Sequence, residues 1–269
     1  MLRKLLKYEI KATARVFLPL YLILFTMAIV NKLISLIFPL GIETPKVVGM
    51  AIYSAILVGM FVATFVMILQ RFYKNLLANE GYLMFTLPTV SWKLICSKLL
   101  VAVLWTTASG LAACISIFII VLGKDELATL LVNLKRLLLS LVSYFGLGVP
   151  LLLLEISLAG FLALAGGILL IYAAMALGHL THRHRIIASV VAFIGLYTIS
   201  LVLFWHGIRI IAAAMPHTIH NFFSWAAQNL GVKYNLHLGL WFIIAITGLS
   251  AAAYFAITNY ILTNRLNLE

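Results

Sequence analysis

Six long apolar runs dominate this sequence and limit what it can fold into. A helix needs about 20 apolar residues to cross a hydrocarbon core of about 30 Å. Six segments meet this requirement, at residues 16–38, 47–69, 99–122, 149–177, 186–205 and 238–262. We therefore predict an all-α integral membrane protein whose six transmembrane helices form a single transmembrane domain over residues 1–269.

The composition supports a membrane environment and argues against a nucleic-acid partner. Hydrophobic residues make up 64% of the chain and charged residues only 10%, whereas soluble domains are about 45–50% apolar and about 25% charged. The net charge of +12 comes from basic residues at the ends of apolar runs rather than along one polar face. Such a distribution is typical of membrane topology and not of a nucleic-acid surface.

The basic residues also predict the orientation of the chain in a plasma membrane. With six spans both termini lie on one side, and a cytoplasmic N-terminus puts 12 of the 19 Lys and Arg residues inside and 7 outside. We therefore expect both termini in the cytoplasm.

Residues 137–177 are apolar for longer than one crossing needs, and two interpretations compete. In one, residues 137–155 form a seventh span. In the other, which we favour, residues 130–144 form an outer amphipathic helix that ends at Gly146, Gly148 and Pro150 before the fourth span. The absence of a polar turn near Glu155 argues against the seventh span.

The first fifteen residues have the pattern of an interfacial elbow helix. Leu5, Leu6 and Ile10 share one helical face with Leu2, while lysines occupy the other face. Glu9 falls on the apolar side and weakens the pattern. We expect this helix, over residues 1–15, to lie in the cytoplasmic headgroup layer.

The predicted inner loop at residues 70–98 is unusually aromatic for a cytosolic segment. Phe72, Tyr73, Leu76 and Leu77 fit one face of a short helix, and Pro88 prevents a continuous helix into the next span. An exposed apolar segment in the cytosol usually needs a partner. Burial of the loop among lipid headgroups is the alternative.

The decapeptide at residues 79–88, Asn-Glu-Gly-Tyr-Leu-Met-Phe-Thr-Leu-Pro, together with Ser91-Trp92 and the last four residues, resembles membrane subunits of type 2 ATP-binding-cassette (ABC) transporters of Gram-positive bacteria. One departure is Asn79, where an acidic residue is usual in that group. The resemblance implies the ABC-2 exporter fold. It also implies that the first inner loop is a coupling helix, which docks on a separate ATPase subunit through Phe72, Tyr73, Leu76, Leu77, Glu80, Gly81, Tyr82, Phe85 and Pro88.

Two further loops are candidates for contacts. The second inner loop contains His182, Arg183, His184 and Arg185, which we interpret as a charge anchor or a second ATPase contact. A metal site is disfavoured there because no thiolate or carboxylate lies within the loop. The last outer loop, at residues 206–237, is expected to contain short helices, in which we favour aromatic packing around His217 and His220 over cation binding.

Glu155 is the only acid within a predicted span. A charged carboxylate there costs about 2.5–3.5 kcal/mol on insertion scales, so its side chain should face protein or water. It is either a substrate or proton site in the pathway or a hydrogen-bonded structural group. Small residues recur at four-residue spacing along residues 55–63 and 159–167, which favours close helix contact within the chain or with a second copy.

No phosphate-binding Gly-x-x-x-x-Gly-Lys-Ser/Thr loop, zinc-protease motif or Gly-x-Ser-x-Gly elbow occurs. We therefore do not expect an enzyme or a bound cofactor; ATP and Mg²⁺ would belong to the partner ATPase. The leading hypothesis is a permease subunit that pairs with a second permease and ATPase subunits to export a peptide, drug or lipid-like substrate. The alternatives are an ion-coupled secondary transporter and a non-transporting immunity or sensor protein.

Overall fold

The computed structural model describes residues 2–37, 44–77, 90–121, 124–181, 184–214 and 231–264. Within these ranges the chain is helical and contains no strand. Seven of its helices are long and apolar enough to cross a membrane. The chain is therefore an all-α protein with the features of a membrane-spanning one, as the sequence predicts.

Six of these helices contain the six predicted spans. They are α1 (Leu2–Ile37), α2 (Thr44–Phe72), α4 (Ser91–Val121), α6 (Val149–His179), α7 (Arg185–Ala214) and α9 (Gly231–Asn264). The seventh is α5 (Lys124–Phe145), which includes the residues 130–144 that were expected to form an outer amphipathic helix and is itself a candidate span by length and composition.

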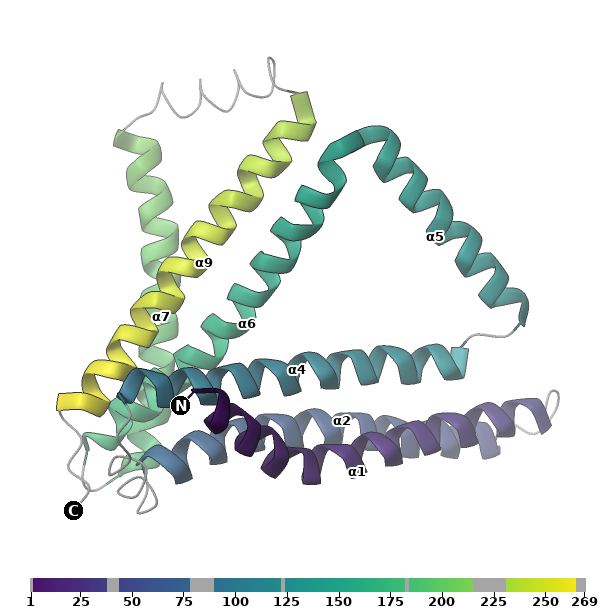
Figure 1. Cartoon of the computed structure of the whole chain (residues 1–269), viewed down its shortest axis with the longest axis horizontal. Coiled ribbons are helices and arrows are strands. Elements are labelled where there is room, and N and C mark those ends of the chain that lie inside the picture. The colour runs from purple at the N-terminus through teal and green to yellow at the C-terminus, as the bar shows by residue number, and fades with distance from the viewer. Residues whose placement is uncertain are drawn as a thin grey trace. The chain divides into compact units, whose positions relative to one another are not determined.

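The chain divides into two compact units, residues 1–137 and 138–269. The first unit contains α1, α2 and α4 (Figure 1). Its core consists of small, aromatic and aliphatic side chains on the facing sides of these helices, including Phe17, Leu24, Tyr53, Met60 and Trp105. α1 lies against both α4 and α2, and it is the element that organises this unit.

The N-terminal residues are not a separate elbow helix, because α1 is continuous from Leu2 to Ile37. It bends in its N-terminal part (Figure 1) and contains Pro19. Proline cannot donate the backbone hydrogen bond to Arg15 and its ring clashes with that turn, which bends a helix without ending it. The position of residues 1–15 in the headgroup layer remains a prediction.

The second unit contains α6, α7 and α9, with α6 packed against both of the others. α6 carries the core of this unit, because its buried residues cluster in its second half, at Tyr172, Ala173, Ala174 and Ala176. A methyl group built on Gly178 would lie 2.6 Å from the Cα of Ser189. Glycine therefore permits the close approach of α6 to the start of α7.

The link between α5 and α6 excludes one of the two interpretations of residues 137–177, the one with a continuous span over residues 137–155. α5 ends at Phe145, a short 3₁₀ turn η2 (Gly146–Gly148) follows, and α6 starts at Val149. Gly146 has φ +57°, a conformation that glycine adopts without strain. A continuous seventh span over residues 137–155 is wrong because the helix breaks inside it.

The helices of the last predicted outer loop differ from the expectation. α7 continues to Ala214 and α9 begins at Gly231, so both ends of residues 206–237 belong to long helices. The apolar pattern of α7 simply continues past Trp205, which is why no separate short helix forms at residues 208–214. His217 and His220 lie outside the described residues.

Candidate functional site

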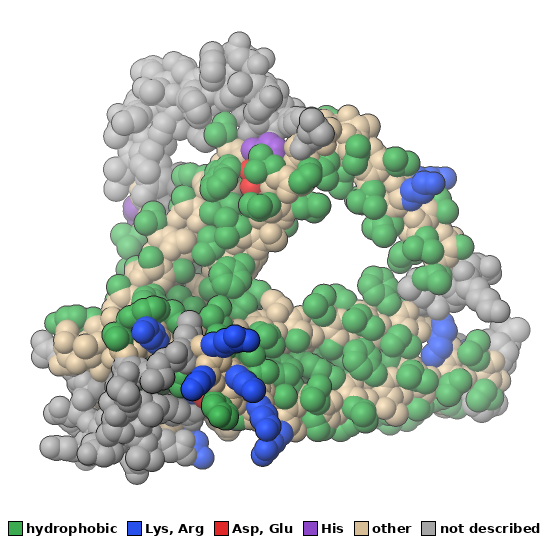
Figure 2. All heavy atoms as spheres, in the orientation of Figure 1, with side chains coloured by type: hydrophobic (Ala, Val, Ile, Leu, Met, Phe, Trp, Pro, Cys, Tyr) green, Lys and Arg blue, Asp and Glu red, His purple; other side chains and the backbone are tan. Residues whose placement is uncertain are grey.

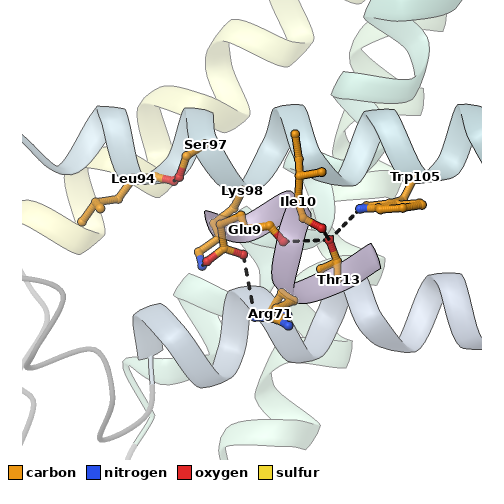
Figure 3. Close-up of polar contacts among 8 residues, drawn as sticks. All are labelled: Glu9, Ile10, Thr13, Arg71, Leu94, Ser97, Lys98 and Trp105. Carbon is orange, nitrogen blue, oxygen red and sulfur yellow. Dashed lines mark hydrogen bonds and ion pairs between the residues drawn. The ribbon is translucent and has the colours of Figure 1, made fainter. Parts of the chain in front are cut away.

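A buried charge cluster joins all three helices of the first unit. Glu9 on α1 forms an ion pair with Lys98 on α4, and Arg71 on α2 lies 3.9 Å from the second carboxylate oxygen of Glu9. Figure 3 shows the three side chains converging from three helices. Lys98 is only 4% exposed, so its charge is removed from water and is compensated by Glu9.

The cluster continues along α1 as a series of polar and aromatic contacts. The indole Nε1 of Trp105 donates a hydrogen bond to the Thr13 hydroxyl at 2.7 Å, and that hydroxyl donates to the carbonyl oxygen of Glu9 at 2.8 Å (Figure 3). The Trp105 ring stacks on Phe17 with centroids 4.5 Å apart. Further along, the Tyr21 hydroxyl lies 2.9 Å from the hydroxyl of Ser109. These contacts fix the register of α1 against α4.

The charge cluster lies near the ends of α2 and α4 between which the decapeptide stands in the sequence. Arg71 is near the C-terminal end of α2 and Lys98 is about two turns into α4. Figure 2 shows Lys and Arg side chains gathered on the same part of this face, near the start of α1. The helices on both sides of residues 78–89 are therefore tied to α1 and to each other.

The residues predicted to contact an ATPase fall into two groups. Phe72 ends α2, and Tyr73, Leu76 and Leu77 continue it as a π-helical turn, η1 (Tyr73–Leu77). Phe72, Leu76 and Leu77 are buried, whereas Tyr73 is 39% exposed. The other predicted contacts, Glu80, Gly81, Tyr82, Phe85 and Pro88, lie outside the described residues.

The second inner loop is short. α6 ends at His179, and the backbone N–H of Thr181 bonds to the carbonyl of Gly178. His184 is exposed, and Arg185 begins α7. His182 and Arg183 lie outside the described residues. The predicted role of this loop remains a prediction.

The second unit contains its own buried acid. Glu155 on α6 is completely buried, and its Oε2 lies 2.6 Å from Nδ1 of His237 on α9. The His237 side chain is 13% exposed, and its ring packs edge-on against Phe145. The other carboxylate oxygen, Oε1, has no hydrogen-bond partner among the described residues. Glu155 thus faces protein, as its position in an apolar helix predicts.

A groove lies between α6, α7 and α9, with a volume of about 390 Å³. Its walls include Gly166, Gly167, Tyr197, Ser200 and Tyr254. The hydroxyls of Ser200 and Tyr254 hydrogen-bond to each other across it. The groove is apolar with few free polar groups, and the described part of the chain has no cluster of three metal-ligating side chains.

The sequence predicts close helix contact along the small residues of 55–63 and of 159–167, and the structure differs in both places. A methyl group built on Gly59 or on Gly167 would have no neighbouring atom within 4 Å, and Ala55 and Ala163 are exposed. Helix contact in α6 is instead made at Gly166, next to Ala251, and at Gly178. The four-residue spacing identified small faces that make no close helix contact at Gly59 and Gly167, and the second of these faces borders the groove between α6, α7 and α9. A contact of these faces with a second copy remains a prediction.

Sequence reasoning missed the Glu9 cluster. Half of the signal was present, because Glu9 is an acid on the apolar face of an amphipathic helix and therefore needs a buried partner. Lys98 gave no such signal, because it directly precedes the predicted span at residues 99–122 and fits a cytoplasmic end of that span. His237 falls at the end of the predicted outer loop at residues 206–237, and no local pattern there points to Glu155.

The fold defines an all-α protein whose long apolar helices have the features of membrane spans. No protein-family model, curated protein or solved structure matches the chain.

Proposed function

We propose that this chain is the permease subunit of an ATP-driven exporter of the ABC-2 type. The observation that carries the proposal is the position of the decapeptide at residues 79–88. It joins α2 to α4, and the adjoining ends of these helices are tied to α1 through Glu9, Lys98 and Arg71. A segment that transmits the movement of a bound protein must be connected firmly to the helices on both sides of it.

The charge cluster gives the segment a mechanical connection. Moving residues 78–89 would shift the ends of α2 and α4, and the Glu9 contacts would carry that shift to α1. Packed helices move as rigid pieces rather than deforming continuously. A movement of the segment would therefore be passed to the three helices of the first unit together.

The proposal requires partners. ATP and Mg²⁺ bind to separate ATPase subunits, because this chain lacks a phosphate-binding loop. A second permease subunit, identical or different, completes the transporter in the plasma membrane. The exported substrate is a peptide, a drug or a lipid-like molecule.

The burial of Phe72, Leu76 and Leu77 decides how the proposal is tested. Their replacement would damage the fold as well as any contact, so the test is confined to Glu80, Tyr82 and Phe85. We expect the triple alanine variant to lose co-purification with the ATPase subunit that the unaltered chain is proposed to retain when isolated from its native membrane, while its amount in the membrane stays unchanged. The matched control is Tyr8→Ala, which removes an aromatic side chain that is 70% exposed on α1. Retained ATPase binding in the triple variant would contradict the proposal.

An ion-coupled secondary transporter is the second candidate, and the buried pair of Glu155 and His237 is the observation that favours it. Ionisable groups inside a membrane domain often bind coupling ions. The two candidates differ in their energy source. Uptake into inside-out vesicles that needs ATP supports the exporter, and uptake driven by an ion gradient without ATP supports the secondary transporter.

A further inference from the structure

The two units tie their helices together in the same way. In each, the first helix packs against the third and the second. Glu9 and Lys98 join α1 to α4, and Glu155 and His237 join α6 to α9. Each of these four residues lies about two turns from the start of its helix. The first and third helices of each unit are therefore parallel and joined near their N-terminal ends by an acid and a base.

The two bases differ in chemistry. A lysine ammonium is charged throughout the physiological pH range, whereas an imidazole ordinarily changes its charge between about pH 5 and pH 8. The ion pair in the first unit is also supported by a second cation, Arg71. The pair in the second unit has no further cation among the described residues that contact it.

We propose that Glu155 and His237 form a proton-binding latch, which holds the N-terminal ends of α6 and α9 together when the pair carries its proton and releases them when it does not. With the proton bound, the pair has no net charge. When the proton leaves, one negative charge remains in a fully buried place where Oε1 has no donor among the described residues. Such a charge is expensive to keep away from water, so the deprotonated pair favours separation of the helix ends and access of water to Oε1.

Within the part of the chain that the structure describes, the surroundings of the pair contain little that could replace the proton. Among the described residues, Glu155 contacts one titratable group, His237, and the neighbouring element contributes Phe145, which cannot titrate. α7 runs opposite to α6, as the contact of Gly178 with Ser189 shows, so its C-terminal part lies near this end of the unit. The titratable and charged groups described there, His206 and Arg209, are exposed. On α6 itself, His179 lies at the opposite end.

The latch can be tested on the full chain in lipid nanodiscs without any ATPase, so its failure and that of the proposed exporter are separate results. Cys96 and Cys114 are first replaced by serine. Spin labels are then attached at Leu153 and Leu236, which are exposed on α6 and α9 near the pair. We expect a narrow distance distribution at an acidic pH, where the pair holds its proton, and a broader, longer one at an alkaline pH, where the proton has left. Labels at Leu180 and Tyr260, exposed near the other ends of these helices, should give the same distribution at both values.

Two variants distinguish pH-dependent release of the Glu155–His237 contact from a general loosening of the second unit. His237→Lys gives the second unit the permanent base of the first, and we expect the distribution at Leu153 and Leu236 to stay narrow at both pH values. Glu155→Gln removes the charge and should also abolish the pH dependence.

Infrared spectroscopy supplies a second measurement that does not depend on labels. The proton is carried by either the carboxyl or the imidazole, so the bands of both groups are followed. A band that titrates in the wild-type chain should vanish or change its midpoint in Glu155→Gln and in His237→Lys. The proposal is overturned by an unchanged distance distribution in the wild-type chain, by pH dependence that persists in His237→Lys, or by the absence of any titrating carboxyl or imidazole band.

Discussion

Glu9 is the residue that connects all three helices of the first unit through charged contacts. Its carboxylate meets a buried ammonium from α4 and lies close to a guanidinium from α2. Removal of one member of a buried pair costs more than the pair contributes, because the remaining charge is left without compensation. The contribution of this pair is therefore best measured by changing both members.

Lys98→Met should lower the free energy of unfolding by about 3 kcal/mol, the lower end of the range for breaking a buried pair, since Arg71 still faces Glu9. The double variant Glu9→Gln with Lys98→Met should recover part of this loss, because no buried charge remains unpaired. Thermal unfolding in detergent micelles measures both. Lys11→Met, at an exposed position of α1, is the matched control. A double variant less stable than the single one would contradict the assigned ion pair.

Trp105 contributes through both its ring and its indole nitrogen. Trp105→Phe keeps an aromatic ring against Phe17 and removes the hydrogen bond to Thr13, so we expect a loss of about 1 kcal/mol of unfolding free energy. Trp92→Phe, at a tryptophan that is 43% exposed, should have no measurable effect. Equal effects of the two substitutions on the unfolding temperature would argue against a structural role for this hydrogen bond.

At the scale of elements, the length of the apolar runs was sufficient to locate all six predicted spans in helices, to within one residue at the ends of α1 and α4. The same reasoning failed where a helix continues without a compositional break. Residues 1–15 join the first span because Pro19 bends α1 and does not end it, and residues 206–214 join α7 because no breaker separates them. Long-range partners were also beyond its reach: neither the pairing of Glu9 with Lys98 nor that of Glu155 with His237 follows from local spacing.

Close packing of α6 against α7 depends on Gly178. Gly178→Ala places a methyl group against the backbone of Ser189, and overpacking of this kind costs about 1–3 kcal/mol. Gly160→Ala and Gly167→Ala introduce the same change in the same helix where no atom lies within 4 Å. We expect the first variant alone to lower the unfolding temperature, as measured by thermal denaturation in micelles. A comparable decrease in all three would show that helix propensity or lipid contact, and not the approach of α7, decides the result.

At the scale of the whole molecule, α5 determines the topology. It qualifies as a candidate span by length and composition, and a seventh crossing would put the two termini on opposite sides of the membrane. However, Lys135 and Arg136 lie halfway along α5, where a crossing would carry both into the hydrocarbon core at a cost of about 2.5–3.5 kcal/mol each. From Glu126 onward, Phe145 is the one buried side chain of this helix, so neither unit by itself encloses these charges.

We therefore expect α5 to lie at the outer surface and both termini to face the cytoplasm. Reporter fusions that are active on one side of the membrane, placed at residue 269 and before residue 1, should both report the cytoplasm, and a cysteine at Ser140 should react with an impermeant reagent from outside. Lys135→Leu with Arg136→Leu removes the main obstacle to insertion, so this variant should shift part of the population to an external C-terminus. An external C-terminus in the unaltered chain would mean that α5 crosses the membrane. In that case the N-terminal ends of α6 and α9 would face the cytoplasm, and the pair of Glu155 and His237 would respond to internal rather than external pH.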